Sequence, residues 1–319
     1  MQKVLIIGGL GFIGWHIIKV LQAQNYAVSV LARSDKKTQT HENVEIIIRD
    51  MQTESDEDVI ALLAQFDGIV FAGGADDRTM PKGDAYTFFH QENVLPSVRL
   101  VSLAKHTNIQ KIVFLGSYFT YFNRSRPDWK MAERHPYVRS RVEQLTQSIA
   151  ASTGKPAVIF LEIPYVFGAA PGQIPLWKPL IEYIDKSPLV FYPEGGTNVV
   201  AVENVADAVA GAFKNAKHGD CIPVAGHNMS WKELITAIAT ALGKKRTVIT
   251  IPGFALTPVG AGIKGVFQLL GKQSGLDIYY FMEIQSSNTF LDTEKYSSYL
   301  GYQPLDLAQS FADTVAACE

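Results

Sequence analysis

Three glycines near the N-terminus have the type and spacing that a phosphate-binding turn requires. Gly8, Gly11 and Gly14 follow a short apolar run directly and open an amphipathic stretch that begins with Phe12 and Ile13. In such a turn one glycine permits the sharp bend, one lets backbone N–H groups approach a phosphate, and one lets the helix pack closely on the strand. The N-terminus of the helix adds partial positive charge. The pattern predicts a cradle for the pyrophosphate of a dinucleotide.

The end of the second strand-like run bears on which dinucleotide binds. About twenty residues past the last glycine, an NAD-binding chain commonly carries a carboxylate for the ribose hydroxyls. This chain has Arg33 there, followed by Lys36 and Lys37. A guanidinium can hold a 2′-phosphate through charge-assisted hydrogen bonds, so we expect NADP (NADPH) rather than NAD. Two alternatives stay open: Asp35 reaches the ribose, or Arg33 is a solvated loop charge.

Composition argues against several other kinds of chemistry. Cys221 and Cys318 lie far apart, with no CxxC or Cys/His spacing, so we expect neither a disulfide framework nor a metal site. The formal net charge of −2, without basic tracts, gives no signature of nucleic-acid binding. The first apolar run has no cleavage site after it and indicates a buried strand rather than a signal peptide. We therefore expect a cytoplasmic protein.

Residues 253–271 form one long apolar segment. Lys264 is its one charged residue, and Pro258 and several glycines interrupt it. A transmembrane helix needs a longer uninterrupted apolar span. We therefore expect a buried helix or a lid, and no membrane insertion.

The first half of the chain alternates short β-branched apolar runs with amphipathic stretches. The runs cover residues 4–7, 28–31, 44–48, 68–72, 111–115 and 157–161, and helical periodicity marks 12–24, 59–66 and 94–105. This alternation is typical of βαβ units, whose right-handed crossovers build a parallel sheet. We predict an α/β fold: a Rossmann-type doubly wound parallel sheet with helices on both faces and a smaller C-terminal substrate-binding part.

The character of the sequence changes after Pro164, where prolines and glycines become frequent and strand-like runs sparse. We assign residues 1–163 to the dinucleotide-binding Rossmann domain. Residues 164–319 are assigned mainly to substrate binding, with elements at about 199–225 returning to the Rossmann sheet. Helices are expected at 203–214, 231–242, 253–270 and 305–317.

Taken together, these features resemble the extended short-chain dehydrogenase/reductase family, also called the NAD-dependent epimerase/dehydratase superfamily. The resemblance covers nearly the whole chain. Besides the glycine loop it includes Asp50-Met51, residues 71–75, Asn93-Val94, 111–117, Pro136-Tyr137, 164–168 and 199–208. Arg33 and the apolar C-terminal part make the chain most similar to the dihydroflavonol-reductase-like branch.

The resemblance implies a catalytic set. Tyr137 would exchange a proton with the substrate oxygen while hydride moves at the nicotinamide, and Ser117 would hydrogen-bond the same oxygen. Tyr137 matches the tyrosine of the family's YxxxK helix, but Arg141 stands in place of the lysine. A guanidinium would stay charged, stabilise tyrosinate and donate to the nicotinamide ribose. Arginine does not readily lose a proton. A proton relay through this side chain, and with it full turnover, is therefore in question.

The resemblance also places further residues beside the cofactor: Asp50 and Met51 at the adenine, Ala72, Gly73 and Gly74 where the chain passes close to it, and Pro164 and Val166 near the nicotinamide carboxamide. Asp50 could equally cap a turn. Asn93 could orient the backbone behind the tyrosine or satisfy a buried helix.

The function expected from these residues is that of an NADP(H)-dependent oxidoreductase acting on a small, largely apolar carbonyl or alcohol. Nucleotide-sugar members of the family commonly hold a diphosphate with arginines of the C-terminal part. After Arg141 this sequence contains a single arginine, Arg246, which argues against such a ligand. The first alternative is still a nucleotide-sugar epimerase or dehydratase. The second is a catalytically impaired NADP-binding sensor, and a homodimer is a possible assembly by analogy.

Overall fold

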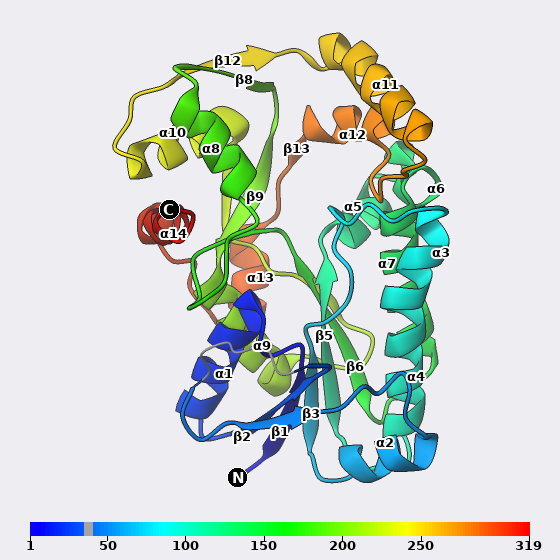
Figure 1. The fold of residues 1–319 in the computed structure, drawn as a ribbon. Coiled ribbons are helices and arrows are strands. Elements are labelled where there is room, and N and C mark those ends of the chain that lie inside the picture. The colour runs from blue at the N-terminus through cyan, green and yellow to red at the C-terminus, as the bar shows by residue number, and fades with distance from the viewer. Residues whose placement is uncertain (35–40) are drawn as a thin grey trace.

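The computed structural model of the chain describes residues 1–34 and 41–319. Within these residues a seven-stranded sheet forms the centre of the N-terminal part (Figure 1). Its strand order is β10-β6-β5-β4-β1-β2-β3, and every neighbouring pair is parallel. The strands are β1 (Lys3–Ile7), β2 (Ala27–Ala32), β3 (Glu45–Ile48), β4 (Gly68–Phe71), β5 (Lys111–Ser117), β6 (Ala157–Ile163) and β10 (Cys221–Pro223). The predicted fold class is confirmed.

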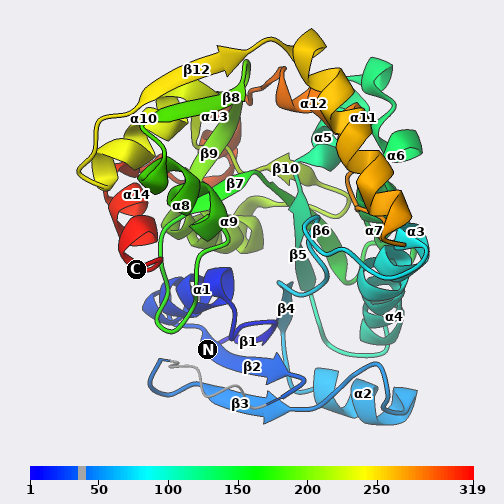
Figure 2. The ribbon, with the colours of Figure 1, turned by 45° about the horizontal axis from the view of Figure 1, so that its top comes forward.

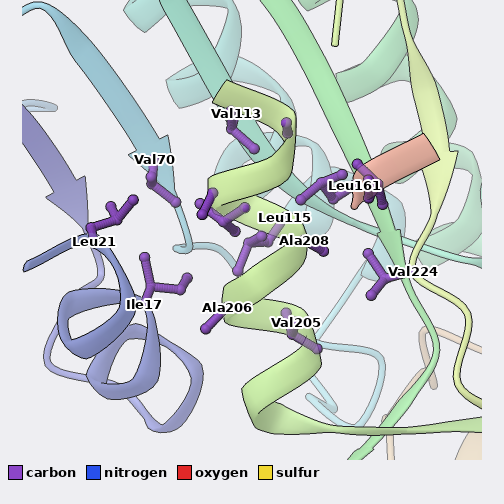
Figure 3. Packing of buried hydrophobic residues seen from close by; sticks show 14 of the residues in the cluster. Ile17, Leu21, Val70, Val113, Leu115, Leu161, Val205, Ala206, Ala208 and Val224 are labelled. Carbon is purple, nitrogen blue, oxygen red and sulfur yellow. The ribbon is translucent and has the colours of Figure 1, made fainter. Parts of the chain in front are cut away.

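Helices cover both faces of this sheet. One face carries α1 (Phe12–Ala23) and α9 (Val202–Asn215), and the other carries α2 (Asp56–Leu63), α4 (Leu95–Ala104) and α7 (Pro136–Ala150). Side chains alternate along the strands, so that Val4 and Ile6 enter one core and Leu5 the other. Figure 3 shows the first core, where Val205 and Ala208 of α9 pack near Leu115 of the sheet.

Strand β1 lies between β2 and β4. After β1 the chain continues toward the β3 edge of the sheet, and after β4 it continues toward the β10 edge. Connections that diverge in this way leave a crevice at the carboxyl ends of the strands. The glycine turn follows β1, and Ser117 is the last residue of β5. The topology therefore brings the two predicted parts of the site to the same edge.

A second, four-stranded sheet belongs to the C-terminal part. It contains β7 (Tyr165–Phe167), β9 (Gly196–Ala201), β11 (His227–Ser230) and β13 (Asn288–Thr289), with β9 paired to all three others. A parallel two-stranded ribbon, β8 (Leu189–Pro193) with β12 (Thr247–Ile251), lies beyond it. Helices α8 (Lys178–Lys186), α10 (Trp231–Ala241) and α14 (Leu307–Ala316) pack on this part.

Shorter helices line the junction between the two parts. They are α3 (Ala85–Phe89), the π-helical turn η1 (His90–Val94), α5 (Phe119–Ser125), the 3-10 turn η2 (Pro127–Trp129), α6 (Met131–Arg134), α12 (Ile278–Gln285) and α13 (Thr293–Leu300). An aromatic core here contains Phe89 of α3, Tyr118 just before α5 and Tyr137 of α7. This core buries the predicted catalytic tyrosine.

The apolar segment forms helix α11 (Gly253–Leu269), but its expected burial is wrong. Leu256 and Gly260 are its buried residues, whereas the side chains of Phe254 and Leu269 are 83% and 89% exposed. Apolar composition predicted the helix but could not say whether another element covers it. Of the helices in the described ranges, none has the length and apolar character to cross a membrane.

Candidate active site

The glycine turn after β1 has the geometry of a close backbone approach. Gly8 has a φ of +85°, and a Cβ there would lie 2.9 Å from the carbonyl carbon of Ala72 at the end of β4. The Gly11 N–H donates to the Gly8 carbonyl at 3.2 Å and closes the turn. A side chain at Gly8 would therefore be strained and would collide with the neighbouring strand.

The start of helix α1 leaves its N–H groups available. Gly11 is the N-cap and no side chain caps the helix, so the first turn, which contains Phe12 and Ile13, has no side-chain partner for its amides. A Cβ on Gly14 would come within 2.5 Å of the Gly9 carbonyl oxygen, whereas one on Gly11 would meet nothing nearer than 3.4 Å. Gly14 serves packing, and the open side of Gly11 fits an approaching anion.

The loop after β7 lies over this turn. The Gln173 side chain donates from Nε2 to the Leu10 carbonyl at 3.1 Å. His16, on α1, places Nε2 2.8 Å from the Ala169 carbonyl oxygen. Burial lowers the pKa of His16. The first turn is thus held between β4 on one side and the β7 loop on the other.

Arg33 lies at the end of β2 with its side chain 67% exposed. Its Nη1 is 3.9 Å from Oε2 of Glu92, a residue about sixty positions later in the chain. This carboxylate offsets the positive potential that a 2′-phosphate would need. Asp35, Lys36 and Lys37, which also entered the cofactor prediction, lie outside the described residues.

Asp50 and Met51 follow β3. The Asp50 carboxylate accepts from the Gln52 N–H at 3.0 Å and caps a turn, which is one of the two interpretations given for it. The Met51 carbonyl accepts a hydrogen bond from Arg99. Contact of either residue with an adenine ring stays a prediction.

The loop after β4 is fixed from behind by Asn93. Asn93 is fully buried; its Oδ1 accepts from the Ala75 N–H at 2.8 Å, and its Nδ2 donates to the Ala75 carbonyl at 3.2 Å. Gly74 has a φ of +113°, and a Cβ there would lie 2.5 Å from Asn93 Oδ1. Ala72 donates its N–H to the Ile7 carbonyl at 2.8 Å, so Ala72, Gly73 and Gly74 run directly beside the first turn.

Ser117, Tyr137 and Arg141 come together at the end of β5. The Ser117 side chain lowers the pKa of the nearby Tyr137 hydroxyl, and both residues are buried. The Arg141 guanidinium carbon lies 5.9 Å from the centre of the Tyr137 ring. The backbone N–H of Tyr137 donates to the Gly275 carbonyl at 2.9 Å, which fixes the start of α7 against the α11–α12 loop.

Arg141 is buried, and its guanidinium group makes only part of its possible hydrogen bonds among the described residues. Nη2 donates to the Leu115 carbonyl at 2.6 Å, whereas Nε is buried without a hydrogen-bond partner among the described residues. Burial raises the pKa of Tyr137, and the Arg141 charge opposes that rise. A buried N–H without a partner is costly unless a ligand accepts from it.

Pro164 and Val166 follow β6. Val166 pairs with Val200 in the second sheet, and its carbonyl accepts from Trp177 Nε1 at 2.8 Å. The structure thus ties this segment to the C-terminal part. Its predicted place beside a carboxamide remains a prediction.

Asp77, in the loop after Gly74, is a residue of the site that the sequence reasoning missed. Its charge acts on Tyr137 and Tyr165, raising the pKa of both hydroxyls, and burial raises its own pKa. The Asp77 residue is half-buried, so some solvent reaches it. The sequence does carry a signal for this residue, because two adjacent carboxylates, Asp76 and Asp77, follow the predicted fourth strand closely.

A hydroxyl cluster at the junction of the two parts was also missed. The Tyr118 hydroxyl lies 3.1 Å from Thr197 Oγ1 on β9 and 3.4 Å from Thr289 Oγ1 on β13. No local pattern signals this cluster, because its members are far apart in the sequence.

Arg246 points away from this site. Its Nε donates to the Ile184 carbonyl and its Nη2 to the Asp185 carbonyl, each at 2.6 Å. The guanidinium is thereby held at the C-terminal end of α8. It is not placed to bind a diphosphate at the strand ends.

Comparison with known proteins identifies similar sequences. The sequence model described as the NAD dependent epimerase/dehydratase family matches residues 4–224. A bifunctional UDP-glucose 4-epimerase and UDP-xylose 4-epimerase 1 of Pisum sativum is 22% identical over 289 residues, covering 76% of this chain and 82% of that protein. A UDP-glucose 4-epimerase of Cyamopsis tetragonoloba is 23% identical over 299 residues, covering 79% and 83%.

Solved structures share the fold. The crystal structure of gox2253 has a TM-score of 0.80 at 19% identity and covers 99% of this chain and 98% of its own. UDP-glucuronic acid 4-epimerase from Bacillus cereus, in complex with NAD, has a TM-score of 0.70 at 15% identity and covers 99% and 96%. The Bordetella bronchiseptica enzyme WbmH, in complex with NAD+, has a TM-score of 0.71 at 15% identity and covers 99% and 98%.

Two expectations from the sequence are corrected by these findings. The NADP-dependent reductase function is wrong, because the curated relatives are UDP-sugar 4-epimerases. The NADP preference is also wrong, since several structural neighbours were solved with NAD. The physical reason for the second error is the exposed Arg33, whose charge Glu92 offsets. The dihydroflavonol-reductase-like branch has no support among these relatives.

Proposed function

Since the chain belongs to the NAD dependent epimerase/dehydratase family, we propose that it is an NAD-dependent epimerase of a nucleotide sugar. When bound, NAD supplies a reversible hydride acceptor, which allows one carbinol carbon of the sugar to be oxidised and then reduced from its other face. The curated 4-epimerase relatives and the NAD-bound structural neighbours support this proposal.

The residues at the strand ends fit the cofactor. The open side of Gly11 and the uncapped first turn of α1 leave room and N–H donors for a pyrophosphate. The buried Nε of Arg141, without a partner among the described residues, would donate to a ribose hydroxyl. These features argue for a dinucleotide along the edge from β1 to β5.

In the proposed reaction Tyr137 takes the proton of the sugar hydroxyl as the carbon is oxidised, and returns it as the carbon is reduced. Ser117, whose side chain acts on the Tyr137 pKa, would donate to the same sugar oxygen. The Arg141 charge favours the tyrosinate form against the effect of burial on the Tyr137 pKa. Tyr137 and Ser117 would thus both act at the hydroxyl oxygen of the one sugar carbon that is epimerised.

The observation that carries the proposal, beside the family, is the arginine at position 141. Net reduction of a carbonyl takes one proton from solvent in every turnover, so a buried phenol must be reprotonated through a relay. Arg141 cannot supply one, because arginine stays protonated, and Nη2 is engaged with Leu115. Epimerisation returns both the hydride and the proton and needs no relay. The chemistry at 141 thus favours a redox-neutral reaction.

The position of Arg246 sets an expectation for binding. Because Ile184 and Asp185 hold this arginine, the C-terminal part supplies no guanidinium for the substrate diphosphate. Uncharged hydrogen bonds to phosphate are weaker than bidentate guanidinium bonds. We therefore expect a KM for the nucleotide sugar near the upper end of the usual range, about 1 mM.

Incubation of the purified chain and NAD with UDP-glucose, UDP-N-acetylglucosamine or UDP-glucuronic acid tests the proposal. Anion-exchange chromatography should resolve an equilibrium mixture of two epimers from one of these substrates. The Tyr137→Phe variant should form the epimer at least about 10²-fold more slowly. Recovery of all three sugars unchanged, while NAD binds, would refute the proposal.

A further inference from the structure

Helix α11 turns an apolar side to solvent. Phe254, Val259, Val266, Leu269 and Leu270, the last directly after the helix, are 83%, 53%, 54%, 89% and 63% exposed. Its buried residues face α12, where a Cβ on Gly260 would lie 3.0 Å from Met282. Leu256 and Gly260 are the buried residues of the helix, so most of its apolar side chains face solvent instead of packing in a core.

The ribbon next to α11 in the chain extends this surface. In the β8–β12 register Phe191 lies opposite Ile249, and both side chains are exposed together with Leu189. A single residue, Pro252, connects the end of β12 to the start of α11. Figures 1 and 2 place β8, β12 and α11 at the same end of the molecule. The α11 surface consists of Leu189, Phe191, Ile249, Phe254, Val259, Val266, Leu269 and Leu270.

The charges of this segment are of one sign. Residues 244–272 contain five basic residues and no acidic one, although the whole chain has a net charge of −2. The basic residues are Lys244, Lys245 and Arg246 before the apolar stretch, Lys264 within it and Lys272 after it. The apolar surface is thus flanked by cations at both ends.

Some of these cations are already paired. Lys244 pairs with Asp185, and Lys264 with Asp277 at 2.5 Å. Lys245 and Lys272 make no ion pair within the described ranges. Lys272 also borders a cavity of about 320 Å³ beside α11, which four basic and two acidic side chains line.

We propose that the α11 surface docks on a bilayer that contains anionic lipid. Exposed leucine and phenylalanine side chains gain free energy on entering the headgroup–acyl boundary, and flanking lysines are attracted to anionic headgroups. No described helix can cross a membrane, so the chain lies on the bilayer rather than through it. A second copy is a poorer occupant, because it would bring its own cations, Lys245 and Lys272, against the same lysines.

Vesicle flotation tests this docking with the full chain. Phosphatidylcholine vesicles are compared with mixed phosphatidylcholine–phosphatidylglycerol vesicles. The wild type should float with the mixed vesicles. Leu269→Gln/Leu270→Gln should weaken binding about ten-fold or more, and Lys245→Gln/Lys272→Gln about five-fold for each lysine.

A matched control changes two exposed leucines elsewhere. Leu95→Gln/Leu305→Gln makes the same chemical change at side chains 52% and 45% exposed, and it should bind vesicles like the wild type. Equal thermal unfolding temperatures show that all variants are folded. The proposal is overturned if the folded wild type floats with neither vesicle, or if control and patch variants bind alike. It is also overturned if ultracentrifugation shows a dimer that the leucine patch variant abolishes, without vesicle binding.

Discussion

Arg141 donates from Nη2 to the backbone carbonyl of Leu115 across 2.6 Å. Leu115 is two residues before Ser117 on β5, so this bond ties the helix that carries Tyr137 to the end of the strand that carries Ser117. The guanidinium is thereby held near the phenol, with its centre 5.9 Å from the ring. Its positive charge acts on the Tyr137 pKa from a fixed position.

Removal of this charge should change the pH dependence of turnover. Arg141 lowers the pKa of Tyr137 against the effect of burial, so Arg141→Ala should raise that pKa further. Less tyrosinate is then present at a given pH, and the acid limb of the kcat/KM profile should move to higher pH. Arg141→Lys keeps the charge and should move the limb less. An acid limb that stays in place in Arg141→Ala would argue against this electrostatic role.

Tyr137→Phe should lower kcat by about 10²- to 10⁴-fold, the usual contribution of a general acid–base group. The ring and its edge contact with Phe89 remain, so the affinity for NAD should change by less than about three-fold. Tyr299→Phe removes a phenol that bonds Asp220 at the surface and serves as the control. Steady-state kinetics and NAD titration separate the two effects, and retained turnover in Tyr137→Phe would exclude the phenol as the proton carrier.

Two glycines of the first turn should respond differently to alanine. Gly11→Ala has room for its methyl group, so the fold should keep its stability while NAD affinity falls about ten-fold or more. Gly8→Ala meets Ala72 at 2.9 Å with a φ of +85° and should cost about 1–3 kcal/mol of folding free energy. Chemical denaturation and NAD titration test the pair. Unchanged NAD affinity in Gly11→Ala would contradict the proposed cradle.

His135 should make stability depend on pH. Burial lowers its pKa to about 4, against 6.5 for the ordinary residue, and its Nδ1 accepts from the Asp277 N–H at 3.0 Å. Between pH 6.5 and 4, His135 binds a proton in the unfolded chain but stays neutral in the folded chain. The free energy of unfolding therefore falls as the pH falls, by up to about 3 kcal/mol. Urea unfolding of wild type and His135→Gln from neutral to acid pH isolates this contribution. Parallel curves for the two proteins would rule it out.

The first half of the fold was predictable because its signals are local. Strand β1, the glycine turn and α1 follow one another in the sequence, and each has a strong pattern of its own. The four-residue spacing from Tyr137 to Arg141 places both on one helix, as expected. Asn93 and the loop it holds were recognisable only through the family resemblance.

The errors arose where distant residues decide the outcome. Oε2 of Glu92 lies 3.9 Å from Nη1 of Arg33, and no residue near Arg33 in the sequence predicts this contact. Tyr118 meets Thr197 and Thr289 through strands of two to six residues, which carry too little periodicity to be seen. The exposure of Leu269 on α11 likewise depends on what packs nearby and not on the apolar pattern itself.

The central claim is that hydride leaves a sugar carbon and returns to that same carbon. Its most direct test uses UDP-glucose deuterated at C4, incubated with the purified chain and NAD, with mass spectrometry of the separated epimers. The account predicts an epimer that keeps its deuterium and no net accumulation of reduced cofactor. Formation of an epimer that has exchanged its label for a solvent proton would contradict it. So would recovery of UDP-glucose, UDP-N-acetylglucosamine and UDP-glucuronic acid unchanged by a chain that binds NAD.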